Sequence, residues 1–177
     1  YLGAPEQLSR DLVLERLQPV RADPTIEKIG QNIKYDLIVF RNEGVDIHNI
    51  GCDTMLASYL LNPPKRAHNL DQIALDFLDH KTITYEDVTG KKGKKANSFA
   101  SVPIEKATPY ACEDADLTLQ LKHALDPLLD KYEVCDIFES MEMPLVPVLV
   151  RALASPHVRV RSAAVRGLAT IGGPQAA

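Results

Sequence analysis

The feature that most constrains the fold of this chain is a long amphipathic stretch, PYACEDADLTLQLKHAL, which starts at Pro109. Leucines recur in it at the spacing of helical turns and predict one buried stripe, made of Leu117, Leu121, Leu125 and Leu128. We expect Pro127 to bend or restart this helix, because proline removes a backbone donor and clashes with the preceding turn. The other elements have to be organised around this helix.

Two pairs of polar residues are spaced about one helical turn apart. Tyr110 and Asp114 stand at i and i+4 in the long stretch, and Asn32 and Asp36 repeat that spacing in GQNIKYDLIVF. Side chains four apart project from one face of a helix. A phenol and a carboxylate placed in this way can share a water molecule while the carboxylate holds a divalent cation. A solvated helix face is the alternative interpretation of either pair alone.

Shorter elements are predicted on both sides of these pairs. Helices are expected over residues 6–18 (between Pro5 and Pro19), 33–42, 53–61, 70–78 and 136–141. Two short strands are expected within 25–31 and 45–52, and a polar loop within 82–101. Strands are therefore few, and the chain should be mostly helical.

Composition places the chain among ordinary globular proteins: it has 177 residues, of which 45% are hydrophobic and 25% charged. It lacks any run near the ~18 apolar residues that span a bilayer, so we expect no membrane association. The N-terminus has neither a secretory pattern nor an initiator Met, which predicts a fragment or a processed product. Three cysteines without C-x-x-C spacing favour reduced thiols and a cytoplasmic protein.

The net charge of −4 does not favour nucleic-acid binding by the chain as a whole. Any electrostatic attraction for phosphates has to come from a local basic segment. Four lysines, Lys91, Lys92, Lys94 and Lys95, form a basic segment that can contact phosphates. A solvated loop is the alternative interpretation.

Several ordered motifs resemble one known family. GQNIKYD, CDTMLASYLLN, HKTITYED, YACEDADLTLQL and EMPLVPVL are similar to segments of the 3′–5′ proofreading exonuclease domain of family A DNA polymerases. The resemblance covers residues 1–149 and implies an α/β fold of the ribonuclease-H-like class. It also implies hydrolysis of the 3′-terminal phosphodiester of single-stranded DNA with two Mg²⁺ or Mn²⁺ ions, in replication or repair.

The resemblance implies a role for each matching residue of this chain. Asp36 and Asp114 match metal-binding carboxylates, and Tyr110 matches a phenol that orients the attacking water. The positions that match contacts to the bound strand are Gln31, Asn32, Lys34, Arg66 and Phe99. An arginine expected directly before His68 is displaced by one position, because Ala67 stands there and Arg66 precedes it. One phosphate contact is therefore in doubt.

A larger departure lies at the beginning of the chain. The family's first motif, an Asp-x-Glu that supplies two of four metal-binding carboxylates, does not precede Asn32. We therefore expect an N-terminally incomplete domain that lacks its first strands, binds metal weakly and is impaired in hydrolysis. Acids in the N-terminal stretch, such as Asp11 and Glu15, are more simply explained as solvated.

The character of the sequence changes near Leu149. Residues 150–177 resemble a single HEAT-like repeat, a helix pair joined by a Ser-Pro-His turn, with a stripe of Val160, Ala164, Leu168 and Ile171 in its second helix. A polymerase domain would follow in the family, so we infer no polymerase activity. Two other functions stay open: a non-catalytic nucleic-acid-binding module, and a scaffold in which the C-terminal helices bind a protein partner.

Overall fold

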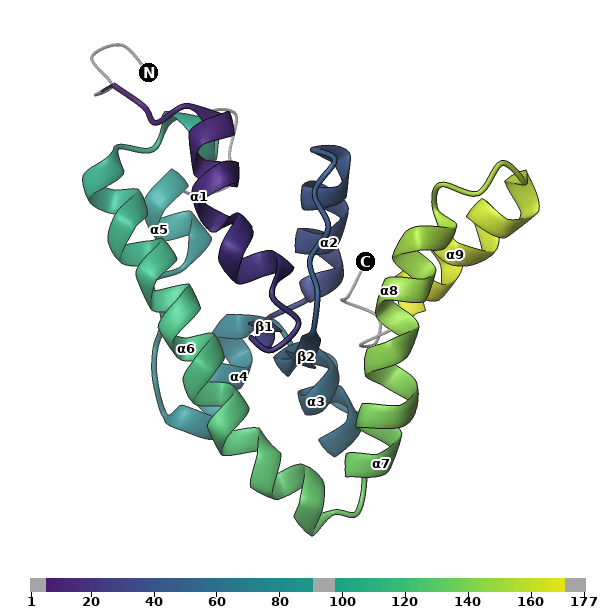
Figure 1. Cartoon of the computed structure of the whole chain (residues 1–177). Helices are drawn as coiled ribbons and strands as arrows, with labels where there is room; N and C mark the ends of the chain where they lie inside the picture. Colours follow the sequence, from purple (N-terminus) through teal and green to yellow (C-terminus); the bar gives the residue numbers. More distant parts are fainter. Residues whose placement is uncertain (1–5, 91–97, 171–177) are drawn as a thin grey trace.

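The computed structural model describes residues 6–90 and 98–170. Its elements are α1 (Arg10–Ala22), β1 (Lys28–Gly30), α2 (Ile33–Asn42), β2 (Ile50–Asp53), α3 (Thr54–Leu61), α4 (Leu70–Leu78), α5 (Tyr85–Thr89), α6 (Ile104–Lys131), α7 (Cys135–Ile137), α8 (Met143–Ala152) and α9 (Val158–Thr170). A 3-10 turn (Phe99–Ser101) precedes α6, and a π-helical turn (Phe138–Glu142) joins α7 to α8. Figure 1 shows α6 and α8 as two arms of a V, with the small sheet and α3 between them.

The sheet consists of two parallel strands, within the described residues, and α2 forms the crossover between them. Lys28 pairs with Ile50 and Gly30 with Asp53, with an irregularity after Lys28. A parallel pair requires such a crossover, because the chain must return to the same end of the sheet. The expected α/β class and the mostly helical content are both confirmed.

Side-chain caps fix where several helices begin. The hydroxyl of Ser9 accepts a hydrogen bond from the amide of Leu12 at the start of α1, and Asn69 caps α4 in the same way. At α5, Thr84 and Asp87 each bind the other's backbone amide, which makes a capping box. These caps set the starts of α1, α4 and α5, and α5 is one that the sequence did not predict.

The core lies between α6 and α8, where α3 and α4 pack on α6, and α2 and β2 pack on α8. The predicted leucine stripe of α6 is buried at Leu117, Leu121 and Leu125, but its last member is Leu129, 2% exposed, rather than Leu128. Leu128 is half-buried against the edge of the core. Helices α3 and α8 contribute fully buried side chains such as Leu56 and Val146. Burial of these side chains is the main stabilising term of the fold.

Two expectations about prolines are wrong. Pro19 was expected to end the first helix, yet α1 runs from Arg10 to Ala22 with Pro19 inside it. Pro127 does not restart α6, which runs through it without a break and continues to Lys131. In both cases the helix loses one backbone hydrogen bond, because proline has no backbone N–H. Pro127 is exposed, so solvent can satisfy the carbonyl that it leaves without a donor.

Two further boundaries differ from expectation. The second strand covers only Ile50–Asp53, because Asn49 adopts a left-handed conformation, φ 52°, which interrupts an extended chain. The segment expected to be a loop contains α5 and the 3-10 turn at Phe99. The four lysines at 91, 92, 94 and 95 lie outside the described residues.

The C-terminal helices form a hairpin that packs on α2. Helix α8 spans Met143–Ala152 and so continues across the boundary expected at Leu149. In α9, Ala164 and Leu168 are buried as predicted, whereas Val160 is 41% exposed, and Ile171 lies outside the described residues. A Cβ added at Gly167 would lie 3.0 Å from a methyl carbon of Leu149, so this glycine lets the two helices approach closely.

Among the residues described, no helix combines the length and the apolar character that crossing a bilayer requires.

Candidate active site

Asp36 and Asp114 line one cavity, although they are 78 positions apart in the chain. The cavity has a volume of about 590 Å³ and is walled by the end of β1, by α2 and by α6, with Gly30, Gln31 and Thr118 among its lining residues. Asp36 reaches it from the first turn of α2, and Asp114 from the first half of α6. The fold thus brings together the two carboxylates for which the sequence predicted a metal-binding role.

Tyr110 lies one turn before Asp114 on α6, and its hydroxyl donates a hydrogen bond to the Asp114 carboxylate. Burial, the nearby Asp114 charge and this hydrogen bond raise the pKa of Tyr110 to about 12, with smaller contributions from Asp71 and Tyr85. The phenol therefore keeps its proton at neutral pH and acts as a hydrogen-bond donor.

Both carboxyl groups of the cavity prefer the neutral form more than an ordinary aspartate does. Desolvation raises the pKa of Asp114, with further raising by Asp71 and Glu113, and the Tyr110 hydrogen bond opposes the shift. Desolvation also raises the pKa of Asp36, although the residue as a whole is exposed. A bound cation would favour the ionised forms again.

Phe99 contacts the other side of Tyr110. Their ring centroids are 5.8 Å apart with a tilt of 54°, and the ring of Tyr85 stacks on Phe99 at 6.0 Å and 18°. These three side chains, Tyr85, Phe99 and Tyr110, are called the aromatic cluster below. The structure thus places the aromatic predicted to pack against the strand beside the phenol predicted to orient water.

Two carboxylates beside the site hold the segment that leads to α5. Glu113 accepts the amide of Ile83 at 2.6 Å and lies 3.0 Å from Nε2 of His80. Asp71 on α4 accepts the hydroxyl of Thr82 at 2.6 Å. Burial alone would raise the pKa of Glu113, but the hydrogen bonds from His80 and the Ile83 amide outweigh it and lower that pKa. The segment is therefore tied to both α4 and α6.

The turn between β1 and α2 is held by a buried carboxylate, Asp53. Its two oxygens accept the amides of Asn32 and Ile33, each at 2.9 Å, and it also caps α3 through the amide of Met55. Asn32 adopts a left-handed conformation with φ 60°. Gln31 donates to the carbonyl of His68 at 2.8 Å and accepts the hydroxyl of Thr54.

The other predicted strand contacts lie apart from the two carboxylates. Lys34 is buried, 6% exposed, and donates to the carbonyl of Leu168 in α9. Asn32 and Lys34 line a separate apolar cavity between α2 and α9. Arg66 is exposed and is not among the residues that line the carboxylate cavity. Of the five predicted contact residues, Gln31 lines the carboxylate cavity and Phe99 touches Tyr110.

The expected chemistry requires divalent cations, so the site must provide side chains that can coordinate them. Hard cations such as Mg²⁺ prefer carboxylate oxygens, and Asp36 and Asp114 supply them in one cavity. In the described part of the chain, no group of three or more His, Cys, Asp or Glu side chains is arranged to hold a metal ion. The residues fit a divalent cation by chemical type, but their number predicts weak binding.

Sequence reasoning missed three residues of this region, Tyr85, Glu113 and Asp53. Asp53 carried a readable signal, because an aspartate directly before an apolar helix is a common N-cap. Glu113 and Tyr85 carried none, since their partners lie 33 and 14 positions away along the chain. Only the folded structure identifies these contacts.

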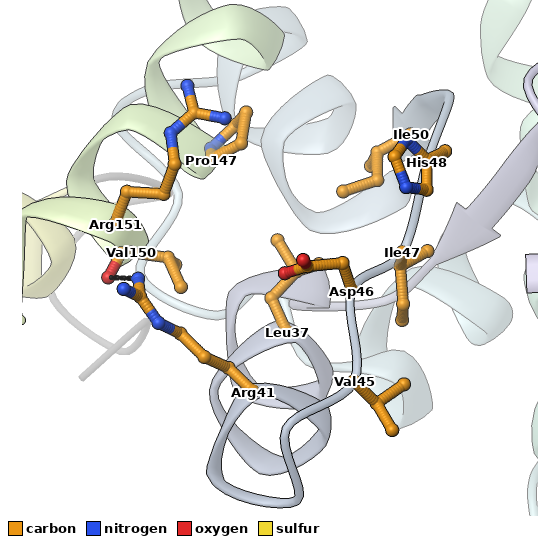
Figure 2. Close-up of a pocket in the computed structure, with 10 residues that line it drawn as sticks. All are labelled: Leu37, Arg41, Val45, Asp46, Ile47, His48, Ile50, Pro147, Val150 and Arg151. Atoms are coloured by element: carbon orange, nitrogen blue, oxygen red, sulfur yellow. Dashed lines mark hydrogen bonds between the residues drawn. The ribbon is translucent and has the colours of Figure 1, made fainter. Parts of the chain in front are cut away.

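A further cavity lies between α2, the segment before β2 and α8 (Figure 2). Arg41 and Arg151 line it together with Asp46 and His48, over an apolar floor that includes Leu37. Figure 2 shows Arg41 reaching the carbonyl of Val150, at 2.6 Å. This cavity contains neither Asp36 nor Asp114, and Arg41 joins α2 to α8 at its edge.

Comparisons with known proteins agree with this geometry. Residues 3–130 match a family described as 3′–5′ exonuclease. The chain is 46% identical over 154 residues to DNA polymerase I of Pseudomonas aeruginosa, covering 85% of this chain and 17% of that protein. It is 39% identical over 148 residues to DNA polymerase I of Rhizobium leguminosarum, covering 84% and 14%. The chain therefore spans less than a fifth of the length of these relatives.

One solved structure shows a similar fold. It is described as the POL domain of Pol1 from M. smegmatis in complex with DNA primer-template and dNTP, with a TM-score of 0.62 and 20% identity. The match covers 82% of this chain and 22% of that one. Together with the family match, it supports the expected ribonuclease-H-like fold.

Proposed function

The chain belongs to the family of 3′–5′ exonuclease domains of family A DNA polymerases, and we propose that its Asp36–Asp114 cavity hydrolyses the 3′-terminal phosphodiester of single-stranded DNA. The observation that carries the proposal is the meeting of Asp36 and Asp114 at one cavity. The hydrogen bond from Tyr110 to Asp114 supports the proposal, because it sets a phenol beside one of the two carboxylates.

The proposed roles follow from the chemistry of each group. Divalent cations, Mg²⁺ or Mn²⁺, supply an activated water and stabilise the leaving 3′ oxygen when bound. Asp36 and Asp114 hold them through carboxylate oxygens. Tyr110 stays protonated because its pKa is about 12, so it orients the water rather than removing a proton from it. Orientation matters because the attack must be in line with the leaving oxygen.

We propose that hydrolysis by this chain alone is impaired. The family resemblance implies four metal-binding carboxylates, and two of them, Asp36 and Asp114, are found in the cavity of the described chain. With fewer negative ligands the attraction for a divalent cation is smaller. Weak metal binding and slow hydrolysis are the expected consequences.

Two further proposals concern the cellular compartment of the chain and a protein partner. The cytoplasm is the proposed place of action, since the substrate is DNA and Cys52, Cys112 and Cys135 are all free thiols. A protein partner is proposed for the C-terminal hairpin, where Val158 and Val165 of α9 are 64% and 57% exposed. Replacing both valines by serine should abolish retention of the partner without changing DNA binding.

Metal binding tests the main proposal. Mn²⁺ should bind the unsubstituted chain weakly, as measured by the paramagnetic resonance signal of the free ion. Asp36→Asn and Asp114→Asn should each weaken that binding at least tenfold, because each removes one anionic ligand. Asp116→Asn, an exposed aspartate on the same helix as Asp114, is the matched control and should change nothing.

A non-catalytic binding module is the second candidate, favoured by the small number of carboxylates and by the exposed aromatic cluster. It predicts binding of a single strand in the presence of chelator, with no nucleotide release on addition of Mn²⁺.

A further inference from the structure

We propose that Tyr85 is an additional substrate-positioning residue, whose ring stacks on a base next to the one that packs on Phe99. The inference rests on the proposed function, because it needs a single strand whose end lies at Asp114. Tyr85 begins helix α5, and the family resemblance implies no role for it.

The ring geometry favours a surface for more than one base. Tyr85 and Phe99 are nearly parallel, at 18° with centroids 6.0 Å apart, and Phe99 in turn contacts Tyr110 at 5.8 Å. Phe99 therefore contacts both other rings, and Tyr110 connects the aromatic cluster to Asp114. Successive unpaired bases stack on aromatic side chains in proteins that hold single strands.

The exposure of Tyr85 and Phe99 distinguishes the aromatic cluster from one that only packs the core. Tyr85 is 52% exposed and Phe99 is 38% exposed, so both rings present a large part of their surface to solvent. Tyr85 therefore keeps part of its ring open to a ligand while it contacts Phe99. An exposed pair of aromatic rings beside a polar site is a surface suited to planar ligands.

The segment that carries Tyr85 is held in place before any ligand binds. Glu113 fixes the amide of Ile83, and the Thr84–Asp87 capping box fixes the start of α5, directly before and after Tyr85. Because Glu113 directly precedes Asp114 on α6, the same turn of helix anchors both the metal-binding carboxylate and the Tyr85 segment. The ring is thus preorganised relative to the site.

Abasic substitution of the strand provides the test. Binding of a 5′-labelled single-stranded oligonucleotide is followed by fluorescence anisotropy, in chelator so that no hydrolysis occurs. The bases of the last few nucleotides are removed one position at a time. The variants are Tyr85→Leu, which keeps apolar volume, Tyr85→Phe, which keeps the ring, and Phe99→Leu.

We expect Tyr85→Leu to weaken binding of the intact strand about five- to twentyfold, and Tyr85→Phe to leave it unchanged. The loss of affinity caused by Tyr85→Leu should disappear when one particular base of the strand is missing. The loss caused by Phe99→Leu should disappear when the neighbouring base is missing instead. Tyr132→Leu is the matched control, because Tyr132 is 59% exposed and follows the far end of α6.

Four results would count against the inference. Equal binding by Tyr85→Leu and Tyr85→Phe would overturn it, and so would a loss that persists whichever base is removed. If Phe99→Leu alone weakens binding, the proposed function stands and only the role of Tyr85 is lost. If the unsubstituted chain binds no oligonucleotide, the proposed function itself fails and takes this inference with it.

Discussion

The Nζ atom of Lys34 donates a hydrogen bond to the carbonyl oxygen of Leu168, at 2.5 Å, and so joins α2 to the last turn of α9. Arg41, seven positions further along α2, makes the corresponding contact with the carbonyl of Val150 near the end of α8. The last carbonyls of a helix lack partners within it and carry partial negative charge, so cations are favourable there. One face of α2 thus caps both C-terminal helices.

Replacing Lys34 by methionine should therefore destabilise the chain by about 1–2 kcal/mol, since it removes a charged donor from a buried carbonyl. The effect is smaller than the loss of an ordinary buried ion pair, because burial already lowers the pKa of Lys34 and the charge is costly to keep there. Unfolding in urea measures the change in the free energy of unfolding that Lys34→Met causes. Lys131→Met, an exposed lysine at the end of α6, is the control, and equal stability of the two variants would contradict the capping role.

Asp114→Asn should stabilise the metal-free chain at neutral pH. Burial raises the pKa of Asp114, so the folded state holds its proton more strongly than the unfolded state does. The stabilisation from this group is complete below the ordinary aspartate pKa of about 3.9 and is lost as the pH rises through the raised folded value. Asparagine has no charge to desolvate and keeps an acceptor for Tyr110.

The expected gain is less than about 1 kcal/mol at neutral pH, because Asp114 is only partly buried. Unfolding in urea with chelator, at a series of pH values, gives the free energy of unfolding against pH for the unsubstituted chain and for Asp114→Asn. They should converge toward acid pH and separate as the pH rises. A less stable Asp114→Asn protein at neutral pH would show that the ionised carboxylate supports the fold.

Glu113→Gln should loosen the segment that carries Tyr85. Hydrogen bonds from His80 and the Ile83 amide lower the pKa of Glu113 in spite of its burial. The stabilisation by Glu113 is therefore present above the ordinary glutamate pKa of about 4.3 and is lost as the pH falls through the lower folded value. Glutamine retains one acceptor but no charge.

Hydrogen exchange at the Ile83 amide reports this change. At neutral pH we expect exchange about fivefold faster in Glu113→Gln, which corresponds to ~1 kcal/mol for a weakened hydrogen bond. Glu105→Gln, an exposed glutamate in the first turn of the same helix, should leave the rate unchanged. Faster exchange in the control as well would mean that the effect is not specific to the Glu113 contacts.

Asn32 requires glycine rather than alanine as its test substitution. Its φ of 60° is accessible to asparagine and glycine, whereas alanine there costs about 1–2 kcal/mol. The buried side-chain oxygen of Asn32 has no hydrogen-bond partner among the described residues, so removing it should cost little stability. Asn32→Gly should unfold near the unsubstituted midpoint and yet bind a single strand several-fold more weakly. Unchanged binding would remove Asn32 from the contact residues.

Local sequence patterns predicted the elements that have strong periodicity. The helices at 33–42, 53–61 and 70–78 agree with α2, α3 and α4 to within a residue, because their apolar spacing coincides with real burial. Local sequence patterns failed to predict secondary structure where contacts outside the local segment determine it. Pro127 was expected to bend or restart a helix that in fact continues through it to Lys131, and α5 depends on a capping box within a polar segment.

The candidate site shows the same division. Asp36, Tyr110 and Asp114 were identified through motif and spacing, and the structure places Asp36 and Asp114 at one cavity. Lys34 was identified in the same way, yet its ammonium group lies against α9, which no local pattern indicates. Residues that act through partners far along the chain, such as Glu113, become visible only in the folded protein.

The most direct test of the account is nucleotide release from a 3′-labelled single strand, with Mg²⁺, with Mn²⁺ and with chelator. We predict slow release that requires a divalent cation, and its loss in Asp114→Ala and Asp36→Ala, with Asp116→Ala unaffected. Release that continues in chelator or in the Asp114→Ala protein, or none from folded chain with Mn²⁺, would contradict the assignment of hydrolysis to the Asp36–Asp114 cavity.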